Sequence, residues 1–184
     1  MCHTLPIEVS AWVKRFAPLV RAGGSVLDLA CGAGRHARWL AARGHAVEAV
    51  DRDAGSVAAL AGIERIRALA ADLEAGPWPF AGRAFDCVVV TNYLHRPLFG
   101  PLLDAIAPGG VLLYETFMRG NERYGRPANP EFLLEPGELL ERVSGRLAVV
   151  AFEQGEVGSP KRAVIQRICA IRAAEPARLP EGAP

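Results

Sequence analysis

The sequence predicts an α/β protein with one open, parallel sheet, and two observations predict this fold class. First, short aliphatic runs alternate with amphipathic or polar segments along the 184 residues, as they do where helices join the strands of a parallel sheet. Second, a turn with two glycines follows the first run, and an aspartate ends the second run. Hydrophobic residues make up 51% of the chain, which is enough for the core of one domain.

The first predicted element is an amphipathic helix over residues 6–20. Its apolar side chains fall on one stripe, which we expect to pack against the sheet: Val9, Trp12, Val13 and Phe16. Gly23 and Gly24 separate this helix from the first strand.

The stretch from Ser25 to Asp53 organises the chain. It predicts a buried strand, a tight turn, a helix and a second strand. Gly32 and Gly34 allow the backbone to turn sharply and to approach a ligand closely. We expect Gly44 to end the helix in a left-handed conformation. Asp51 falls at the carboxyl end of the second strand, where ligands bind in open parallel sheets.

This stretch predicts a site for a nucleoside-containing cofactor. A carboxylate at Asp51 suits the two hydroxyls of a ribose, and the amides of the turn suit an anionic group of the same ligand. Two kinds of cofactor are compatible with this stretch: a dinucleotide, and a nucleoside that carries an amino-acid group. Gly32-x-Gly34-x-x-Ala37 with Asp51 matches a dinucleotide pattern. Asp28, however, would repel a pyrophosphate, whereas it could bind the ammonium group of an amino-acid moiety directly or through water.

The later elements follow from apolar runs and their breakers. We expect helices at residues 54–60, 98–107 and 135–143, and strands at residues 66–70, 85–90, 111–115, 146–152 and 163–171. Residues 117–136 form a long polar and aromatic loop, which we interpret as a candidate lid above the site. We expect one domain over residues 1–175 and a flexible tail at 176–184.

Two motifs give the chain a family resemblance. Val-Leu-Asp-Leu-Ala-Cys-Gly-Ala-Gly at 26–34 resembles motif I of class I S-adenosylmethionine-dependent methyltransferases, and Val-Glu-Ala-Val-Asp at 47–51 resembles their motif II. Ala30 stands where the family usually has its first glycine. The run Ala-Pro-Gly-Gly-Val-Leu-Leu at 107–113 is similar to the family's loop before strand five. Gly34-Arg35-His36 is similar to the small tellurite-resistance-type methyltransferases.

The resemblance implies a Rossmann-like, doubly wound sheet of seven strands, mostly parallel with an antiparallel last strand, and helices on both faces. It also implies S-adenosylmethionine as the cofactor. Asp72 would bind the adenine amino group, or else it caps the turn that follows it. The implied cofactor-binding positions are Asp28, Ala30, Cys31, Gly32, Gly34, Arg35, Asp51, Arg52, Asp72, Leu73, Thr91 and Asn92.

Methyl transfer from a sulfonium needs alignment more than acid–base chemistry, because the methyl group is already activated. A base is needed only if the acceptor must lose a proton. We name three catalytic candidates: His95, Tyr93 and Glu115. His95 is alternatively a solvated or capping residue, Tyr93 packs beneath the cofactor, and Glu115 forms a salt bridge with Arg119 or Arg123.

The composition of the chain indicates which kinds of acceptor, metal site and cellular location to expect. The formal net charge of +1 argues against a nucleic-acid surface and favours a small-molecule acceptor, such as a thiol or a chalcogen oxyanion. The four cysteines include no Cys-x-x-Cys pair, so we expect no metal site and a reducing, cytoplasmic location. No apolar run is long enough to cross a membrane. We expect a monomer or a homodimer. Three alternatives stay open: a protein or RNA methyltransferase that docks through Arg119, Arg123 and Arg126, a non-catalytic cofactor-binding domain, and a nicotinamide-dependent oxidoreductase.

Overall fold

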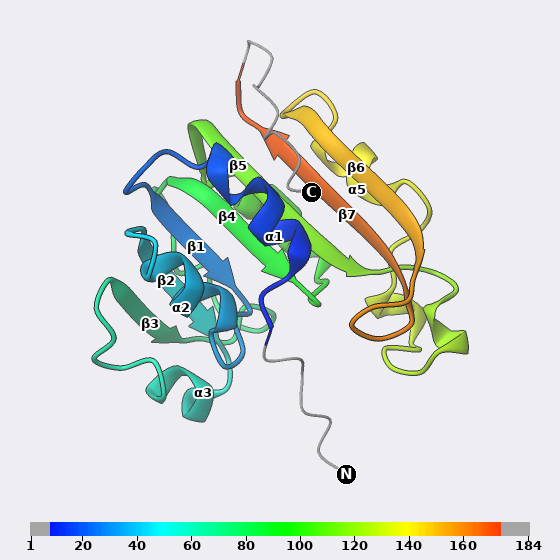
Figure 1. Ribbon diagram of the computed structural model, residues 1–184, viewed down its shortest axis with the longest axis horizontal. Helices are drawn as coiled ribbons and strands as arrows, with labels where there is room; N and C mark the ends of the chain where they lie inside the picture. The colour runs from blue at the N-terminus through cyan, green and yellow to red at the C-terminus, as the bar shows by residue number, and fades with distance from the viewer. Residues whose placement is uncertain (1–7, 174–184) are drawn as a thin grey trace.

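The computed structural model describes residues 8–173, and these residues form the predicted seven-stranded sheet (Figure 1). The strand order is β3-β2-β1-β4-β5-β7-β6. All neighbours from β3 to β5 pair in parallel, whereas β7 runs antiparallel to both β5 and β6. The last strand of the chain is therefore the antiparallel one, as expected. The strands are β1 Ser25–Leu29, β2 Ala46–Asp51, β3 Ile66–Ala70, β4 Phe85–Thr91, β5 Ile106–Phe117, β6 Ala148–Val157 and β7 Ala163–Ile171.

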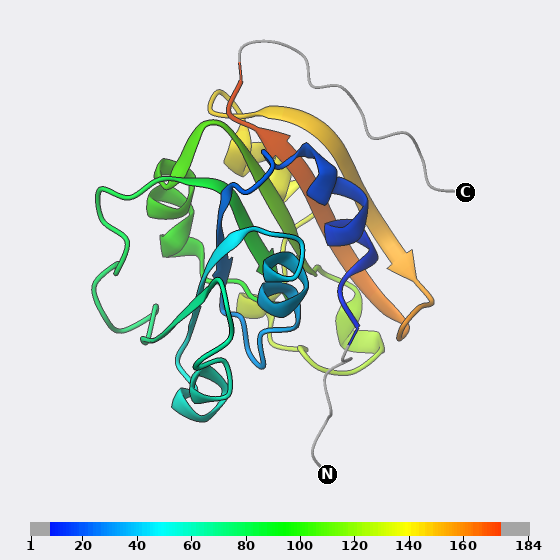
Figure 2. The same cartoon turned by 60° about the vertical axis from the view of Figure 1, so that its left-hand side comes forward.

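Helices cover both faces of the sheet (Figures 1 and 2). Helices α1 and α2 pack on one face with the side chains of one core cluster, and α4 and α5 pack on the other face with a second cluster. The α-helices are α1 Ala11–Phe16, α2 Arg35–Ala41, α3 Ala54–Ala58, α4 Phe99–Asp104 and α5 Glu138–Val143. Short 3-10 helices are η1 Ala17–Leu19, η2 Arg96–Leu98, η3 Asn121–Arg123 and η4 Pro130–Phe132.

The central strand β4 shows how the two cores are built. Cys87 and Val89 point into the cluster under α1 and α2, while Val88 and Val90 point into the cluster under α4 and α5. All four are fully buried. A strand that is covered on both faces needs apolar residues at every position rather than at alternate ones, which explains its continuous apolar run.

The N-terminal helix is shorter than the prediction of residues 6–20. It begins after Ser10, because the hydroxyl of Ser10 accepts hydrogen bonds from the backbone amides of Trp12 and Val13 at 3.1 and 3.4 Å. It continues as η1, where Pro18 lies in the first turn. Residues 6 and 7 lie outside the described residues.

The helix predicted at 98–107 ends at Asp104, and the strand predicted at 111–115 spans 106–117. The reason is a contact across the sheet. The Phe85 amide donates to Ala105 O at 2.8 Å, and Phe85 pairs with Ile106, so the chain joins β4 before its proline and glycines. Pro108-Gly109-Gly110 is then an irregularity inside the strand. A Cβ on Gly110 would lie 2.9 Å from Phe85 O.

Three other boundaries differ. The strand predicted at 146–152 runs to Val157 in a long pairing with β7. The helix predicted at 54–60 ends at Ala58, and the helix predicted at 135–143 begins at Glu138. Gly44 has the expected left-handed conformation, with φ 91°. The loop at 117–136 is ordered: η3 and η4 form within it, and residues 118 and 134 pair in a bridge. The predicted tail, residues 176–184, lies outside the described residues.

Candidate functional site

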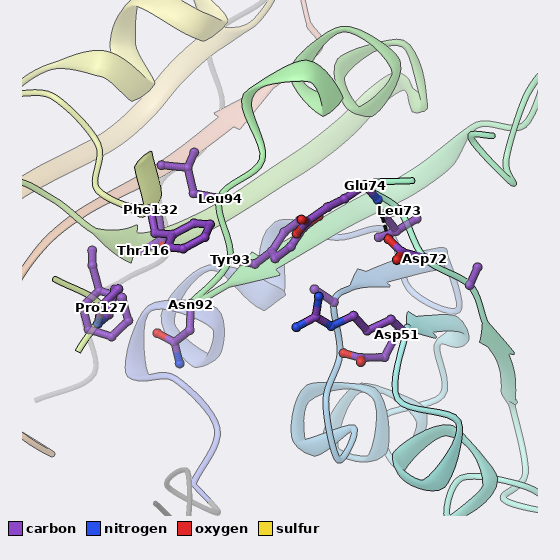
Figure 3. Close-up of a pocket in the computed structure, with 14 residues that line it drawn as sticks. Asp51, Asp72, Leu73, Glu74, Asn92, Tyr93, Leu94, Thr116, Pro127 and Phe132 are labelled. Atoms are coloured by element: carbon purple, nitrogen blue, oxygen red, sulfur yellow. Dashed lines mark hydrogen bonds between the residues drawn. The ribbon is translucent and has the colours of Figure 1, made fainter. Parts of the chain in front are cut away.

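A cavity of about 310 Å³ opens at the carboxyl ends of the strands (Figure 3). It lies where the strand order reverses between β1 and β4, which is the usual ligand position in a doubly wound sheet. Seven residues that the sequence named line it: Ala30, Asp51, Arg52, Asp72, Leu73, Asn92 and Tyr93. Seven others complete the wall: Ala71, Glu74, Leu94, Thr116, Phe117, Pro127 and Phe132.

The glycine loop after β1 has the predicted sharp turns. Gly32 and Gly34 have φ values of 52° and 71°, and Gly34 packs so closely that an added Cβ would lie 2.5 Å from Leu60 Cδ2. Ala30 also lies in the left-handed region, with φ 53°. An alanine is strained there, which is consistent with the glycine that the family usually has at this position.

Asp51 joins the glycine loop to the cavity. Its Oδ2 accepts the Gly32 amide at 2.7 Å, and its Oδ1 accepts the Asp53 amide at 2.9 Å. A carboxylate has about four lone-pair sites, so two remain for other donors on the cavity side. This arrangement suits the vicinal hydroxyls of a ribose.

Asp72 has the capping role that we predicted as the alternative to an adenine contact, and it also lies at the cavity. Its Oδ1 accepts the backbone amides of Glu74 and Ala75 at 2.9 and 3.2 Å, so it does cap the turn after β3. These bonds lower the pKa of Asp72 and keep it ionised. The residue also lines the cavity beside buried Leu73. An acceptor and an apolar surface are therefore present together, as an adenine ring requires.

Asp28 lies beneath the loop rather than in the cavity wall. It is 1% exposed, and its Oδ2 accepts the Ala37 amide at 2.9 Å in the first turn of α2. Burial raises the pKa of Asp28 to about 7, although the Ala37 bond and Arg35 act in the other direction.

Polar contacts beside the glycine loop connect α2 to β4 through three residues: Arg35, His36 and Thr91. Thr91 Oγ1 lies 3.4 Å from His36 Nδ1 and accepts from Arg35 Nη2 at 3.5 Å. The Ser10 amide donates to His36 Nε2 at 3.2 Å. Burial lowers the pKa of His36 to about 3, and Arg35 adds to this effect, so the ring is neutral. Neither Thr91 nor Arg35 lines the cavity.

Of the three catalytic candidates, only Tyr93 lines the cavity. Its buried hydroxyl has no hydrogen-bond partner within residues 8–173, and burial, followed by the charge of Glu74, raises its pKa, so the phenol stays protonated. His95 is half-buried at the start of η2 and lies outside the cavity wall.

Glu115 also lies outside the cavity wall, and its predicted ion pair was wrong. It pairs with Arg167 of β7 at 3.3 Å and accepts the Ser10 hydroxyl at 2.8 Å. Arg119 instead pairs with Glu135 at 2.8 Å. The partner of Glu115 comes from a neighbouring strand 52 residues away, which local sequence cannot indicate.

The cysteine of the glycine loop is an inert packing residue. Cys31 is buried, and burial raises its pKa, so the thiolate is disfavoured. Cys87 and Cys169 are likewise buried and free. Within residues 8–173, no three histidine, cysteine or acidic side chains are grouped to hold a metal ion. None of the helices in that range has the length and apolar character to cross a membrane.

Comparison with known proteins identifies the fold and the domain. Residues 26–110 match a family described as "Methyltransferase domain". The structure is similar to TehB from Haemophilus influenzae, with a TM-score of 0.74 and 19% identity over 92% of this chain and 64% of that one. The chain thus spans just under two thirds of the length of TehB. A search of curated proteins finds no match.

Two further structures are similar. A TehB-like S-adenosylmethionine-dependent methyltransferase from Corynebacterium glutamicum has a TM-score of 0.65 and 18% identity over 90% of this chain and 89% of that one. Coclaurine N-methyltransferase, bound to N-methylheliamine and S-adenosylhomocysteine, has a TM-score of 0.68 and 12% identity over 87% of this chain and 72% of that one.

These structures share the fold of this chain, and the family match extends from β1 into β5 across the glycine loop, Asp51 and Asp72. The fold predicted from the motifs is confirmed, and residues 26–110 match a methyltransferase domain, which agrees with the predicted enzyme class and cofactor. Two carboxylates, Asp51 and Asp72, line the cavity, as the predicted ribose and adenine contacts require, whereas Asp28 lies beneath the glycine loop.

Proposed function

We propose that this chain is an S-adenosylmethionine-dependent methyltransferase and that its methyl acceptor is a small molecule. The observation that supports this proposal is the continuity of the cavity. Asp51 and Asp72 line it on one side, and Pro127 and Phe132, from the ordered loop after β5, line it on the other (Figure 3). A second ligand that enters from the loop side would meet the methyl group within one enclosed space.

The chemistry asks little of the side chains. S-adenosylmethionine supplies a methyl group activated by a sulfonium. The glycine loop and Asp51 would fix the position of the ribose, while Asp72 and Leu73 would orient the adenine. The loop after β5 shields the other side from water. We attribute the rate to the exclusion of water and to the alignment of the reacting atoms, because an in-line displacement requires the nucleophile, the methyl carbon and the leaving sulfur to lie on one line.

The arginines of the loop after β5 favour a small acceptor over a macromolecule. Two of the three loop arginines considered for docking are already engaged, since Arg119 pairs with Glu135 and Arg123 donates to Gly120 O at 3.1 Å. A flat basic docking surface is therefore not supported on this loop.

Calorimetric titration with S-adenosylhomocysteine, with NAD as the parallel control, tests the cofactor site. We expect binding of the first ligand only, and Asp51→Ala should weaken it by about 10- to 100-fold, because hydrogen bonds to a charged group contribute about 1.5–3 kcal/mol. Asp53→Ala is the matched control, since Asp53 caps α3 through the Gly55 amide at 3.0 Å and lies outside the cavity wall. Equal affinity of the two variants would contradict the ribose contact.

Turnover separates an enzyme from a non-catalytic cofactor-binding domain. An enzyme should release S-adenosylhomocysteine from S-adenosylmethionine when an acceptor is added. Binding without release, across a panel of small acceptors, would support the non-catalytic alternative.

We also propose that residues 1–175 act as one domain, as a monomer or homodimer in the cytoplasm. Three buried, free cysteines suit a reducing compartment. Light scattering with size exclusion measures the oligomeric state, and a mass above that of a dimer would contradict it.

A further inference from the structure

We propose that the acceptor is an apolar, ring-bearing small molecule that attacks through sulfur or nitrogen, and that Phe132 and Asn92 select and orient it. This inference rests on the methyl-transfer function proposed above. Three features of the cavity carry it: the composition of the wall on the loop side, the lack of a base in that wall, and the position of the Asn92 side chain.

The wall on the loop side is uncharged. Its described members are Leu94, Thr116, Phe117, Pro127 and Phe132. The charged lining residues belong instead to the segments after β2 and β3, beside the cofactor positions. Figure 3 shows Asp51 and Asp72 on one side of the cavity and Pro127, Thr116 and Phe132 on the other.

Phe132 is unusual among the described residues. Its side chain is 48% exposed, and it is the only aromatic among the three large apolar residues left exposed there. It also lines the cavity. An exposed phenylalanine on an otherwise well-anchored loop offers a face on which a ring can stack.

The same wall disfavours oxyanions and cationic acceptors. An oxyanion would need a cation there. The lining arginine, Arg52, follows Asp51 on the cofactor side, Arg119 is paired with Glu135, and Arg126, although exposed beside Pro127, does not line the cavity. A cationic acceptor would face the sulfonium with no carboxylate in this part of the described wall. A neutral aromatic amine meets neither penalty, and an aryl thiolate carries one weakly hydrated charge on sulfur, which a single amide donor can bind.

The nucleophile follows from the lack of a base on the loop side of the described cavity wall, since the lining carboxylates, Asp51, Asp72 and Glu74, lie on the opposite side. Tyr93 stays protonated, and His95 and Glu115 lie outside the wall. The acceptor must therefore bring an available lone pair, as a thiolate or an unprotonated nitrogen does. That lone pair forms the new bond to the methyl carbon, and the electrons of the broken methyl–sulfur bond stay on the departing thioether. A nitrogen that carried a proton loses it afterwards to water.

Asn92 is placed to hold such a nucleophile. Its backbone has φ 56°, and its backbone N–H donates to Glu115 O at 2.9 Å, which fixes this left-handed residue just after β4. In Figure 3 its carboxamide lies between Asp51 and the Pro127–Phe132 side. The amide nitrogen can donate to a thiolate, and the amide oxygen can accept from an N–H group.

Release of S-adenosylhomocysteine with four probe acceptors tests the substrate class. Thiophenol and aniline should be methylated, whereas phenol and sodium tellurite should show kcat/KM values at least about tenfold lower. Preference for tellurite, or no turnover with thiophenol and aniline while S-adenosylhomocysteine still binds, would overturn this inference and leave the cofactor site intact. Failure to bind S-adenosylhomocysteine would instead refute the proposed function itself.

Three variants test the residues, with thiophenol as the acceptor. Phe132→Ala should raise KM about tenfold with little change in kcat, since it removes stacking area. Asn92→Gly, which keeps the left-handed backbone, should lower kcat about three- to tenfold at similar KM. Arg126→Ala is the control and should change neither value. S-adenosylhomocysteine should bind all three variants as it binds the wild type. An unchanged KM in Phe132→Ala, or a loss of activity in Arg126→Ala, would overturn the assignment.

Discussion

Gly34 gives the sharpest test of how the glycine loop is held. It has φ 71°, begins α2, and lies against Leu60, which is fully buried. A Cβ built on Gly34 would be 2.5 and 2.7 Å from the two methyl carbons of Leu60. Gly34→Ala therefore adds a backbone cost and a steric clash. Gly32, with φ 52° and no atom within 4 Å of an added Cβ, carries the backbone cost alone and is the matched control.

The magnitudes separate the two variants. A left-handed alanine costs about 1–2 kcal/mol, and the stiffer unfolded chain returns about 0.4–1 kcal/mol. Gly32→Ala should therefore reduce the free energy of unfolding by about 0–1.5 kcal/mol. Overpacking against Leu60 adds about 1–3 kcal/mol, so Gly34→Ala should cost about 1–4 kcal/mol.

Chemical denaturation of both variants measures this difference, and thermal melts should follow it at about 2–4 °C per kcal/mol. In a Leu60→Ala background the clash is gone, so Gly34→Ala should then cost no more than Gly32→Ala. A coupling of about 1–3 kcal/mol between positions 34 and 60 is expected. Equal losses for the two glycine variants, or no coupling, would refute the close approach to Leu60.

Three further predictions follow from polar groups. Burial raises the pKa of Asp28 from 3.8 to about 7, so its ionisation lowers the stability of the fold as the pH rises between these values. Asp28→Asn should therefore raise Tm above pH 7 and weaken S-adenosylhomocysteine binding, and an unchanged slope of Tm against pH would contradict this. Burial would raise the pKa of Glu138, but Arg96 and Arg142 hold it at about 2, so the contribution of Glu138 to stability is complete above pH 4.5 and is lost toward pH 2. Glu138→Gln should flatten the fall of Tm at acid pH, and a Tm–pH curve parallel to that of the wild type would disprove the pairing. Asn121 is fully buried, donates to Pro127 O at 3.0 Å and accepts the Val164 amide at 3.1 Å. Asn121→Ala should lower the free energy of unfolding by about 1–3 kcal/mol in denaturation and lower kcat/KM for the acceptor in rate assays, whereas full activity would mean that other residues hold the loop.

Local sequence was sufficient to predict the half of the site that we propose for the cofactor. The glycine loop, Asp51 and Asp72 act through their own neighbours: Asp51 binds amides within the same strand–turn–helix unit, and Asp72 caps its own turn. Local signals were weaker at element ends. The start of β5 was misplaced because pairing with Phe85 decides it, not the preference of proline and glycine for turns.

The acceptor half was decided by tertiary structure. Asn92, Thr116 and Phe132 are far apart in sequence and lie at one cavity only because β4 and β5 are neighbours and the loop after β5 folds back on them. The partner of Glu115 was set in the same way, by the antiparallel register of β7. The sequence by itself determined the order of the strands and helices, the apolar central strand and the cofactor loop, because these depend on residues within one turn or one strand. Only the tertiary structure decided which side chains line the cavity side proposed for the acceptor, because that depends on which elements pack together.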